Sequence, residues 1–146
     1  MINKTLLFRL LISSYLIVTS ALVMANEESQ LADFTTDGCS MFPDGTNEQP
    51  TLWRHCCVAH DFSYWQGGTY QQRKLADKAL RLCLAEVDLP SLGSMMEIGV
   101  RLGGSPYFPT PFRWGYGWPY MRGYKALTEQ ELVKVAEKAP SNLKDY

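Results

Sequence analysis

The adjacent cysteines Cys56 and Cys57 restrict the fold of this chain more than any other feature. The chain has 146 residues and four cysteines, of which the other two are Cys39 and Cys83. Neighbouring cysteines are a poor steric match for a disulfide with each other. If all four cysteines are oxidised, each member of the adjacent pair must bond to a distant cysteine, and two pairings remain.

The N-terminal residues 1–25 predict an export signal. A positively charged start precedes an apolar run at 10–23, and the small residues Val23 and Ala25 favour cleavage before Asn26. A membrane anchor is the alternative, but the run is shorter than the roughly 20 residues that span a bilayer. We therefore expect a secreted or periplasmic protein, and an oxidising compartment favours two disulfides.

The remaining residues, 26–146, are enough for a single domain with a hydrophobic core. Cleavage would remove two of the 14 basic residues and none of the 15 acidic ones, so the mature chain carries a net negative charge. Nucleic-acid-binding domains favour basic surfaces, which argues against nucleic acid as a partner. We expect a monomer with no transmembrane segment in the mature chain.

The region around the cysteine pair predicts a helical hairpin. One helix is expected over about 50–66, and the glycine pair 67–68 would end it. Thr69 and Gln72 have the spacing of a capping box, which opens a second helix running to about Ala85. Two helices joined by so short a turn must lie antiparallel.

The register of this hairpin can be estimated, because residues equally far from the turn lie at the same height. With the turn centred near residue 68, His60 lies opposite Asp77, and Cys56 lies opposite Cys83. A disulfide between these two cysteines would link the helices and leave the other two to pair. That second bond would draw the loop at 37–38 onto the first helix.

A histidine with an aspartate behind it is the arrangement of a general base. Asp77 would orient the imidazole of His60 and stabilise its protonated form. Ser63 lacks the turn setting of a nucleophilic serine, which leaves water as the nucleophile. Asp61 beside the base could hold a cation, and the oxygen-rich turns of residues 35–46 favour calcium over zinc. A divalent ion there would polarise an ester carbonyl.

Two other interpretations remain open. Cys56, Cys57 and His60 could form a zinc module, although adjacent thiols lack the usual spacing of zinc ligands. A His-Asp neighbour pair on a helix is also often no more than a solvated polar face. In that case the stapled hairpin would serve a structural or binding role.

The pattern resembles the secreted phospholipase A2 superfamily. The motif Cys-Cys-x-x-His-Asp-x-x-Tyr begins at Cys56, and Asp77 and Cys83 follow on the next helix. The match covers roughly residues 37–83. The short link between the helices and the sequence Asp-Gly-Cys-Ser starting at Asp37 look like the compact microbial branch of the superfamily. The glycine-rich calcium loop of the animal enzymes is absent.

This resemblance implies a mainly α-helical, phospholipase A2-like domain that hydrolyses the sn-2 ester of glycerophospholipids with Ca²⁺, at a membrane or micelle surface. A catalytically inactive lipid-binding or structural relative is the alternative. The resemblance implies that His60 is the general base, that Asp77 is the carboxylate behind it and that Tyr64 forms a hydrogen bond to that carboxylate. It implies calcium ligation by Asp61, Asp37 and the Gly38 carbonyl. The implied disulfides are Cys39–Cys57 and Cys56–Cys83.

The C-terminal third lies outside this pattern. A capping box at Ser94–Glu97 predicts a short apolar helix, and another at Thr128–Glu131 predicts a terminal amphipathic helix. Between them, the aromatic segment 103–124 contains prolines that exclude a long helix. It could complete the core around the hairpin, or form an acyl-chain wall or membrane-facing rim with Arg113 and Arg122 near phosphates.

Overall fold

The structure is a computed structural model that describes residues 30–146, and the described part contains helices and no β-strand. The expected export signal at 1–25 lies outside the described residues. No helix in the described part is long and apolar enough to cross a membrane. The helices are α2 (Arg54–Gln66), α3 (Tyr70–Glu86), α4 (Pro90–Gly103) and α5 (Glu129–Lys138), followed by the short 3-10 helix η1 (Leu143–Asp145).

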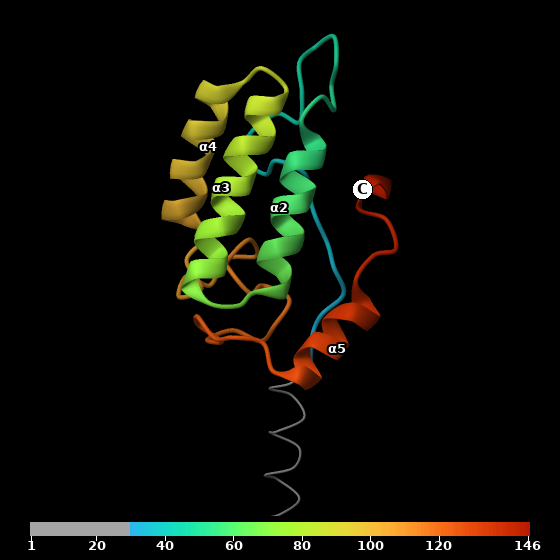
Figure 1. Ribbon diagram of the computed structural model, residues 1–146, viewed down its shortest axis with the longest axis vertical. Helices are drawn as coiled ribbons and strands as arrows, with labels where there is room; N and C mark the ends of the chain where they lie inside the picture. Colours follow the sequence, from blue (N-terminus) through green and yellow to red (C-terminus); the bar gives the residue numbers. More distant parts are fainter. Residues whose placement is uncertain (1–29) are drawn as a thin grey trace, which may run out of the picture. The chain divides into compact units, whose positions relative to one another are not determined.

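Helices α2, α3 and α4 lie side by side, and each runs opposite to the one before it (Figure 1). The predicted antiparallel hairpin of α2 and α3 is therefore confirmed, and α4 adds a third helix against α3. Gly67 ends α2 with a φ of 70°, a backbone conformation that favours glycine. Thr69 then caps α3 through the predicted box with Gln72.

Two predicted helix starts are wrong. Helix α2 begins at Arg54 rather than near residue 50, because residues 50–53 form tighter turns, with Arg54 N donating to Thr51 O at 3.2 Å. Helix α4 begins at Pro90, whose fixed φ suits the first helical turn. Ser94 therefore lies inside α4, where its hydroxyl donates to Pro90 O at 3.0 Å instead of capping the helix.

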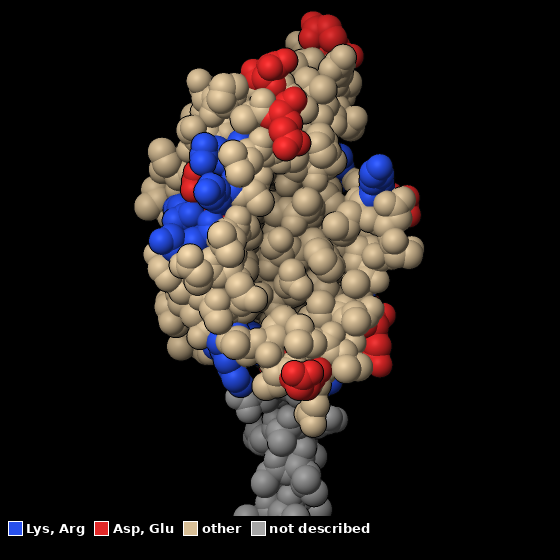
Figure 2. Space-filling model, viewed as in Figure 1, with Lys and Arg blue, Asp and Glu red and all other residues tan. Residues whose placement is uncertain are grey.

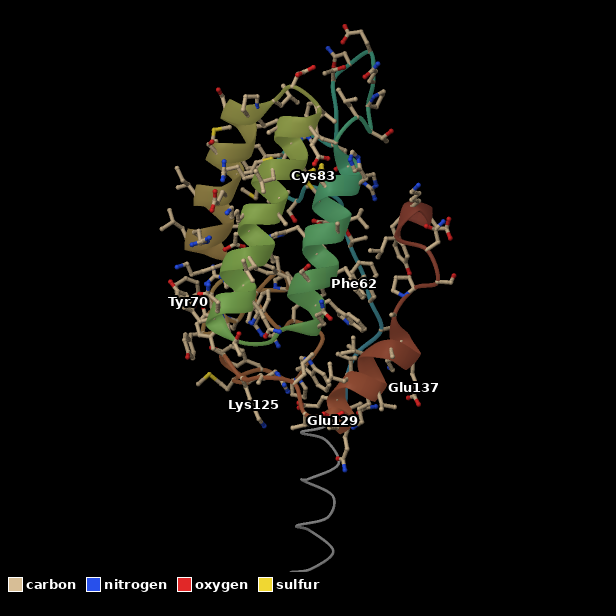
Figure 3. The ribbon with its side chains drawn as sticks, viewed as in Figure 1. Phe62, Tyr70, Cys83, Lys125, Glu129 and Glu137 are labelled. Atoms are coloured by element: carbon tan, nitrogen blue, oxygen red, sulfur yellow. A yellow bond between two sulfur atoms is a disulfide. The ribbon has the colours of Figure 1, made fainter. Side chains whose placement is uncertain are left out.

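Both disulfides have the expected pairing, Cys39–Cys57 and Cys56–Cys83. The second links α2 to α3, and Figure 3 shows Cys83 at this junction. The described residues contain no free cysteine, so the zinc module is excluded in this oxidised chain. His55 lies close to the Cys56–Cys83 disulfide, but both sulfurs are already bonded to each other.

Helix α2 packs on two sides. One face carries Val58, Phe62 and Trp65 against the segment that precedes the helix and against the C-terminal part of the chain. Figure 3 shows Phe62 on this side, and its ring lies 5.6 Å from that of Phe34. The opposite face carries Cys57, His60 and Tyr64 toward α3 and α4. The polar face is therefore enclosed by helices rather than solvated.

The aromatic segment 103–124 completes the core. Trp114 and Trp118 are buried, and their indole N–H groups donate to the carbonyls of Gly68 and Gln66 at 2.9 and 2.8 Å. These bonds fasten the segment to the end of α2. Arg122 forms an ion pair with Glu131 of α5 at 2.6 Å and is largely buried, so it serves the packing of the terminal helix.

Candidate active site

His60 and Asp77 face each other across the α2–α3 interface. The Nε2 atom of His60 lies 3.1 Å from Asp77 Oδ1, and both side chains are buried. Tyr64, one turn along α2, donates its hydroxyl proton to the same Asp77 oxygen at 2.7 Å. The predicted pair and the predicted tyrosine contact therefore both occur.

The ionisation of Asp77 fixes which imidazole nitrogen is free. Burial alone would raise the pKa of Asp77, but hydrogen bonds from His60 and Tyr64 outweigh it and lower the pKa below its ordinary value. An ionised carboxylate only accepts hydrogen bonds, so Nε2 of His60 carries the proton. In the neutral imidazole the Nδ1 atom then has the lone pair that a general base requires.

Two arginines surround this pair. Arg101 of α4 forms an ion pair through its Nε with the second oxygen of Asp77. Arg73 of α3 is buried and donates from Nε to the Tyr64 hydroxyl at 3.0 Å. The hydroxyl of Tyr64 has a single proton, so accepting from Arg73 directs that proton to Asp77. Neither arginine was identified from the sequence.

A cavity of about 280 Å³ opens beside His60. Its wall is mainly apolar and includes the neighbouring residues His60 and Asp61. The glycines of α4 widen it, because a Cβ at Gly99 would meet no atom within 4 Å. The apolar side chains of the lining are Met41, Phe42, Leu80, Met96, Val100 and Phe112.

Asp61 lies where this cavity adjoins a second, more polar one of about 260 Å³ that Asp37 also lines. Burial raises the pKa of Asp61 to about 7, and the negative charges of Asp37 and Asp44 add to the effect. The hydroxyl of Thr36 donates to Asp61 Oδ2 at 2.5 Å and partly offsets it. A carboxylate held among other carboxylates in a half-buried place fits a hard divalent cation, which would relieve this repulsion.

The loop before α2 is fixed close to this carboxylate. Gly38 has a φ of 80°, and a Cβ there would overlap the side chains of Asp44 and Arg54. The Cys39–Cys57 disulfide ties the next residue to α2, and Cys39 N donates to Asp44 Oδ1 at 2.8 Å. Gly38 therefore lines the larger cavity together with Asp61, and Asp37 lines the second one together with Asp61. These three residues could hold a cation.

Ser63 and His55 take no part in this arrangement. The hydroxyl of Ser63 donates to the carbonyl of Ala59 at 3.1 Å, a bond within its own helix. His55 is exposed one turn before the site.

Comparison with known proteins gives no match for this chain: no protein-family model, no curated protein and no solved structure is similar to it. The function is therefore inferred from the site and from the residue pattern around His60. The residues of the site come from the loop before α2, from the helices α2, α3 and α4, and from the aromatic segment, which contributes Phe112.

Proposed function

We propose that this protein hydrolyses the sn-2 ester of glycerophospholipids in a calcium-dependent reaction, and that it acts outside the cytoplasm. One observation supports this above all. A histidine whose proton is fixed by a buried aspartate lies on the wall of an apolar cavity, next to a half-buried carboxylate of raised pKa. The base, the acyl-chain site and the cation site are therefore adjacent.

The reaction follows from the state of His60. Its Nδ1 takes a proton from a water molecule while the water oxygen attacks the ester carbonyl. Asp77 stabilises the resulting imidazolium, which becomes doubly hydrogen-bonded and charged. When the tetrahedral intermediate collapses, the ester C–O bond breaks and the imidazolium returns its proton to the departing alkoxide. The products are a free fatty acid and a lysophospholipid.

The negative charge of the intermediate needs a partner. Ca²⁺ bound by Asp61, Asp37 and the Gly38 carbonyl would polarise the ester carbonyl and neutralise this charge. These residues line the two cavities beside His60, and their oxygen donors suit calcium better than zinc. Without the cation, the same carboxylates would repel the developing oxyanion.

The substrate class rests on the larger cavity and on the residue pattern. Its apolar lining and its size suit an acyl chain, which such a wall would hold without a polar partner. The motif around His60 resembles the secreted phospholipase A2 superfamily, and the pairing of the disulfides agrees with that resemblance. Two disulfides also suit a chain that folds in an oxidising compartment.

The test uses phosphatidylcholine vesicles whose sn-2 acyl chain carries the label. We expect labelled fatty acid to be released with millimolar calcium, to stop with a chelator and to resume when calcium is restored. Labelled lysophospholipid in place of labelled fatty acid, which marks cleavage at sn-1, or release that a chelator leaves unchanged, would contradict the proposal.

A non-catalytic lipid-binding protein is the second candidate, because the apolar cavity alone could hold an acyl chain. It predicts that labelled phospholipid binds and stays intact in the same assay. Binding would then be unaffected by replacing His60 with asparagine.

A further inference from the structure

We infer that Arg101 is a positioning residue for the proposed reaction: it holds the buried carboxylate of Asp77 in the one orientation that keeps His60 aligned. The inference rests on the proposed function for its kinetic consequence. The contact between Arg101 of α4 and Asp77 of α3 is observed in the structure and does not depend on that function.

The guanidinium of Arg101 is fixed at three points. Its Nε pairs with Asp77 Oδ2, and its Nη2 donates to the carbonyl of Lys74 at 3.1 Å and to Glu97 at 3.2 Å. Two of these partners belong to α3 and the third to its own helix. The arginine therefore bridges the two helices at the position of Asp77.

Asp77 needs such a clamp because its other oxygen is shared. Oδ1 accepts from both His60 and Tyr64, and the carboxylate has no exposure to solvent. The χ2 torsion of an aspartate is broad, so a carboxylate held on one side only can rotate. A donor on Oδ2 prevents that rotation and satisfies a buried lone pair that water cannot reach. Rotation would misdirect Nδ1 of His60.

Arg73 supports the backbone of Arg101. Besides its bond to Tyr64, it donates from Nη2 to the carbonyls of Val100 and Arg101 at 2.8 Å each. Arg73 thus anchors the backbone from which Arg101 extends. The two arginines fix both ends of the chain of hydrogen bonds through Tyr64 and Asp77.

Arg81 provides a matched control. It also forms an ion pair with Glu97, at 2.8 Å, and its side chain is exposed to a similar degree, 35% against 31% for Arg101. The pairs that it forms do not include Asp77. Figure 2 shows basic side chains gathered over the region of α3 and α4. Removing Arg81 changes the local charge equally and leaves the Asp77 carboxylate untouched.

The kinetic experiment compares Arg101→Ala, Arg101→Lys and Arg81→Ala on the same vesicles with calcium. We expect Arg101→Ala to lower kcat by about tenfold to a hundredfold, the usual effect of losing an orienting partner, while KM stays within about twofold. Lysine keeps the charge and should recover part of kcat. Methylguanidinium added to Arg101→Ala should also restore part of it, because the site is partly exposed.

Three outcomes would overturn the inference. Arg101→Ala with unchanged kcat is one, and an equal loss in Arg81→Ala is another. A third is a loss in Arg101→Ala that neither lysine nor methylguanidinium restores, since that would indicate a general loss of structure.

A spectroscopic measurement separates this inference from the proposed function. The Nε2–H proton of His60, identified by its absence in His60→Asn, reports the bond to Asp77 in NMR spectra without any substrate. Its resonance should move in Arg101→Lys and stay in place in Arg81→Ala. If the wild-type protein hydrolyses nothing, the proposed function fails, and a moved resonance still supports the clamp. If it hydrolyses lipid and the resonance stays in place in Arg101→Lys, the clamp fails alone.

Discussion

Tyr64 donates its hydroxyl proton to Asp77 Oδ1 across 2.7 Å, from one turn beyond His60 on the same helix. Burial raises the pKa of Tyr64 well above its ordinary value, and the charge of Asp77 raises it further. The phenol therefore stays protonated throughout the working pH range. It acts as a permanent donor to the carboxylate that orients His60.

Replacing Tyr64 with phenylalanine removes this donor and keeps the ring. A hydrogen bond to a charged group contributes about 1.5–3 kcal/mol, so we expect the free energy of unfolding to fall by about 2 kcal/mol. Arg73 loses a partner at the same time. Activity should fall less than in Asp77→Asn, because His60 and Arg101 still bind the carboxylate. Urea unfolding and initial rates measure both effects, and an activity loss equal to that of Asp77→Asn would contradict the assigned role.

Asp61 should make stability depend on pH when calcium is absent. Its pKa rises from 3.8 to about 7 on folding. The folded chain therefore keeps this proton at a higher pH than the unfolded chain does, so its contribution to stability falls as pH rises from about 4 to about 7. Asp61→Asn removes this contribution. The variant should be more stable than the wild type at pH 8 without calcium, and the difference should disappear near pH 4.

Calcium should make the wild type more stable than Asp61→Asn at pH 8. A ligand at a hundred times its Kd adds about 2.7 kcal/mol to the free energy of unfolding. We expect the wild type at pH 8 to gain stability of this order from calcium, and Asp61→Asn to gain almost none. Thermal unfolding with calcium and with chelator measures both. An equal calcium effect in the two proteins would remove Asp61 from the cation site.

Gly99 should control the length of the acyl chain that fits. Gly99 lines the larger cavity, and a Cβ there would meet no atom within 4 Å, so a larger side chain has room beside the cavity. Glycine inside a helix costs about 1 kcal/mol relative to alanine, so Gly99→Leu should fold at least as well as the wild type. Its kcat/KM should fall for long-chain phospholipids and much less for short-chain ones. Gly99→Ala should show a smaller loss, and equal losses on both substrates would indicate that the chain binds elsewhere.

Removing either disulfide should lower the free energy of unfolding, but only removal of Cys39–Cys57 should also weaken calcium binding. Removing either one costs about 3 kcal/mol by the loop-entropy estimate. Cys39→Ser with Cys57→Ser also frees the loop that carries Asp37 and Gly38, so the stabilisation by calcium should fall as well. Cys56→Ser with Cys83→Ser leaves that loop tied to α2. Calcium titrations of both double variants under native conditions check this, and equal affinities would show that the tether does not shape the site.

The sequence predicted the hairpin and the His60–Asp77 pair because both depend on local geometry. The glycine turn at 67–68 and the capping box at Thr69 set the height of each residue on α2 and α3. This register places Asp77 and Cys83 of α3 opposite His60 and Cys56 of α2. Steric exclusion left two disulfide pairings, the register favoured Cys56 with Cys83, the resemblance agreed, and the structure has this pairing.

Arg101 and Arg73 could not be predicted in the same way. Their roles depend on how α4 is rotated against α3, and no local signal in the sequence sets that rotation. Even the start of α4 was misplaced, because Pro90 and Ser94 both carry start signals and the proline prevails. A usable hint was the position of Arg101 in the last turn of a helix whose other charged residue is Glu97, one turn earlier.

The most direct test of the account compares wild-type protein with His60→Asn on sn-2-labelled phosphatidylcholine in millimolar calcium. Asparagine cannot accept a proton from water, and general-base catalysis contributes roughly 10²–10⁴-fold. Thermal unfolding and calcium titration of the variant serve as controls for its fold and its cation site. We predict that the wild type releases labelled fatty acid and that His60→Asn releases it at least about a hundredfold more slowly. A variant that folds, binds calcium and hydrolyses within twofold of the wild-type rate would contradict the account.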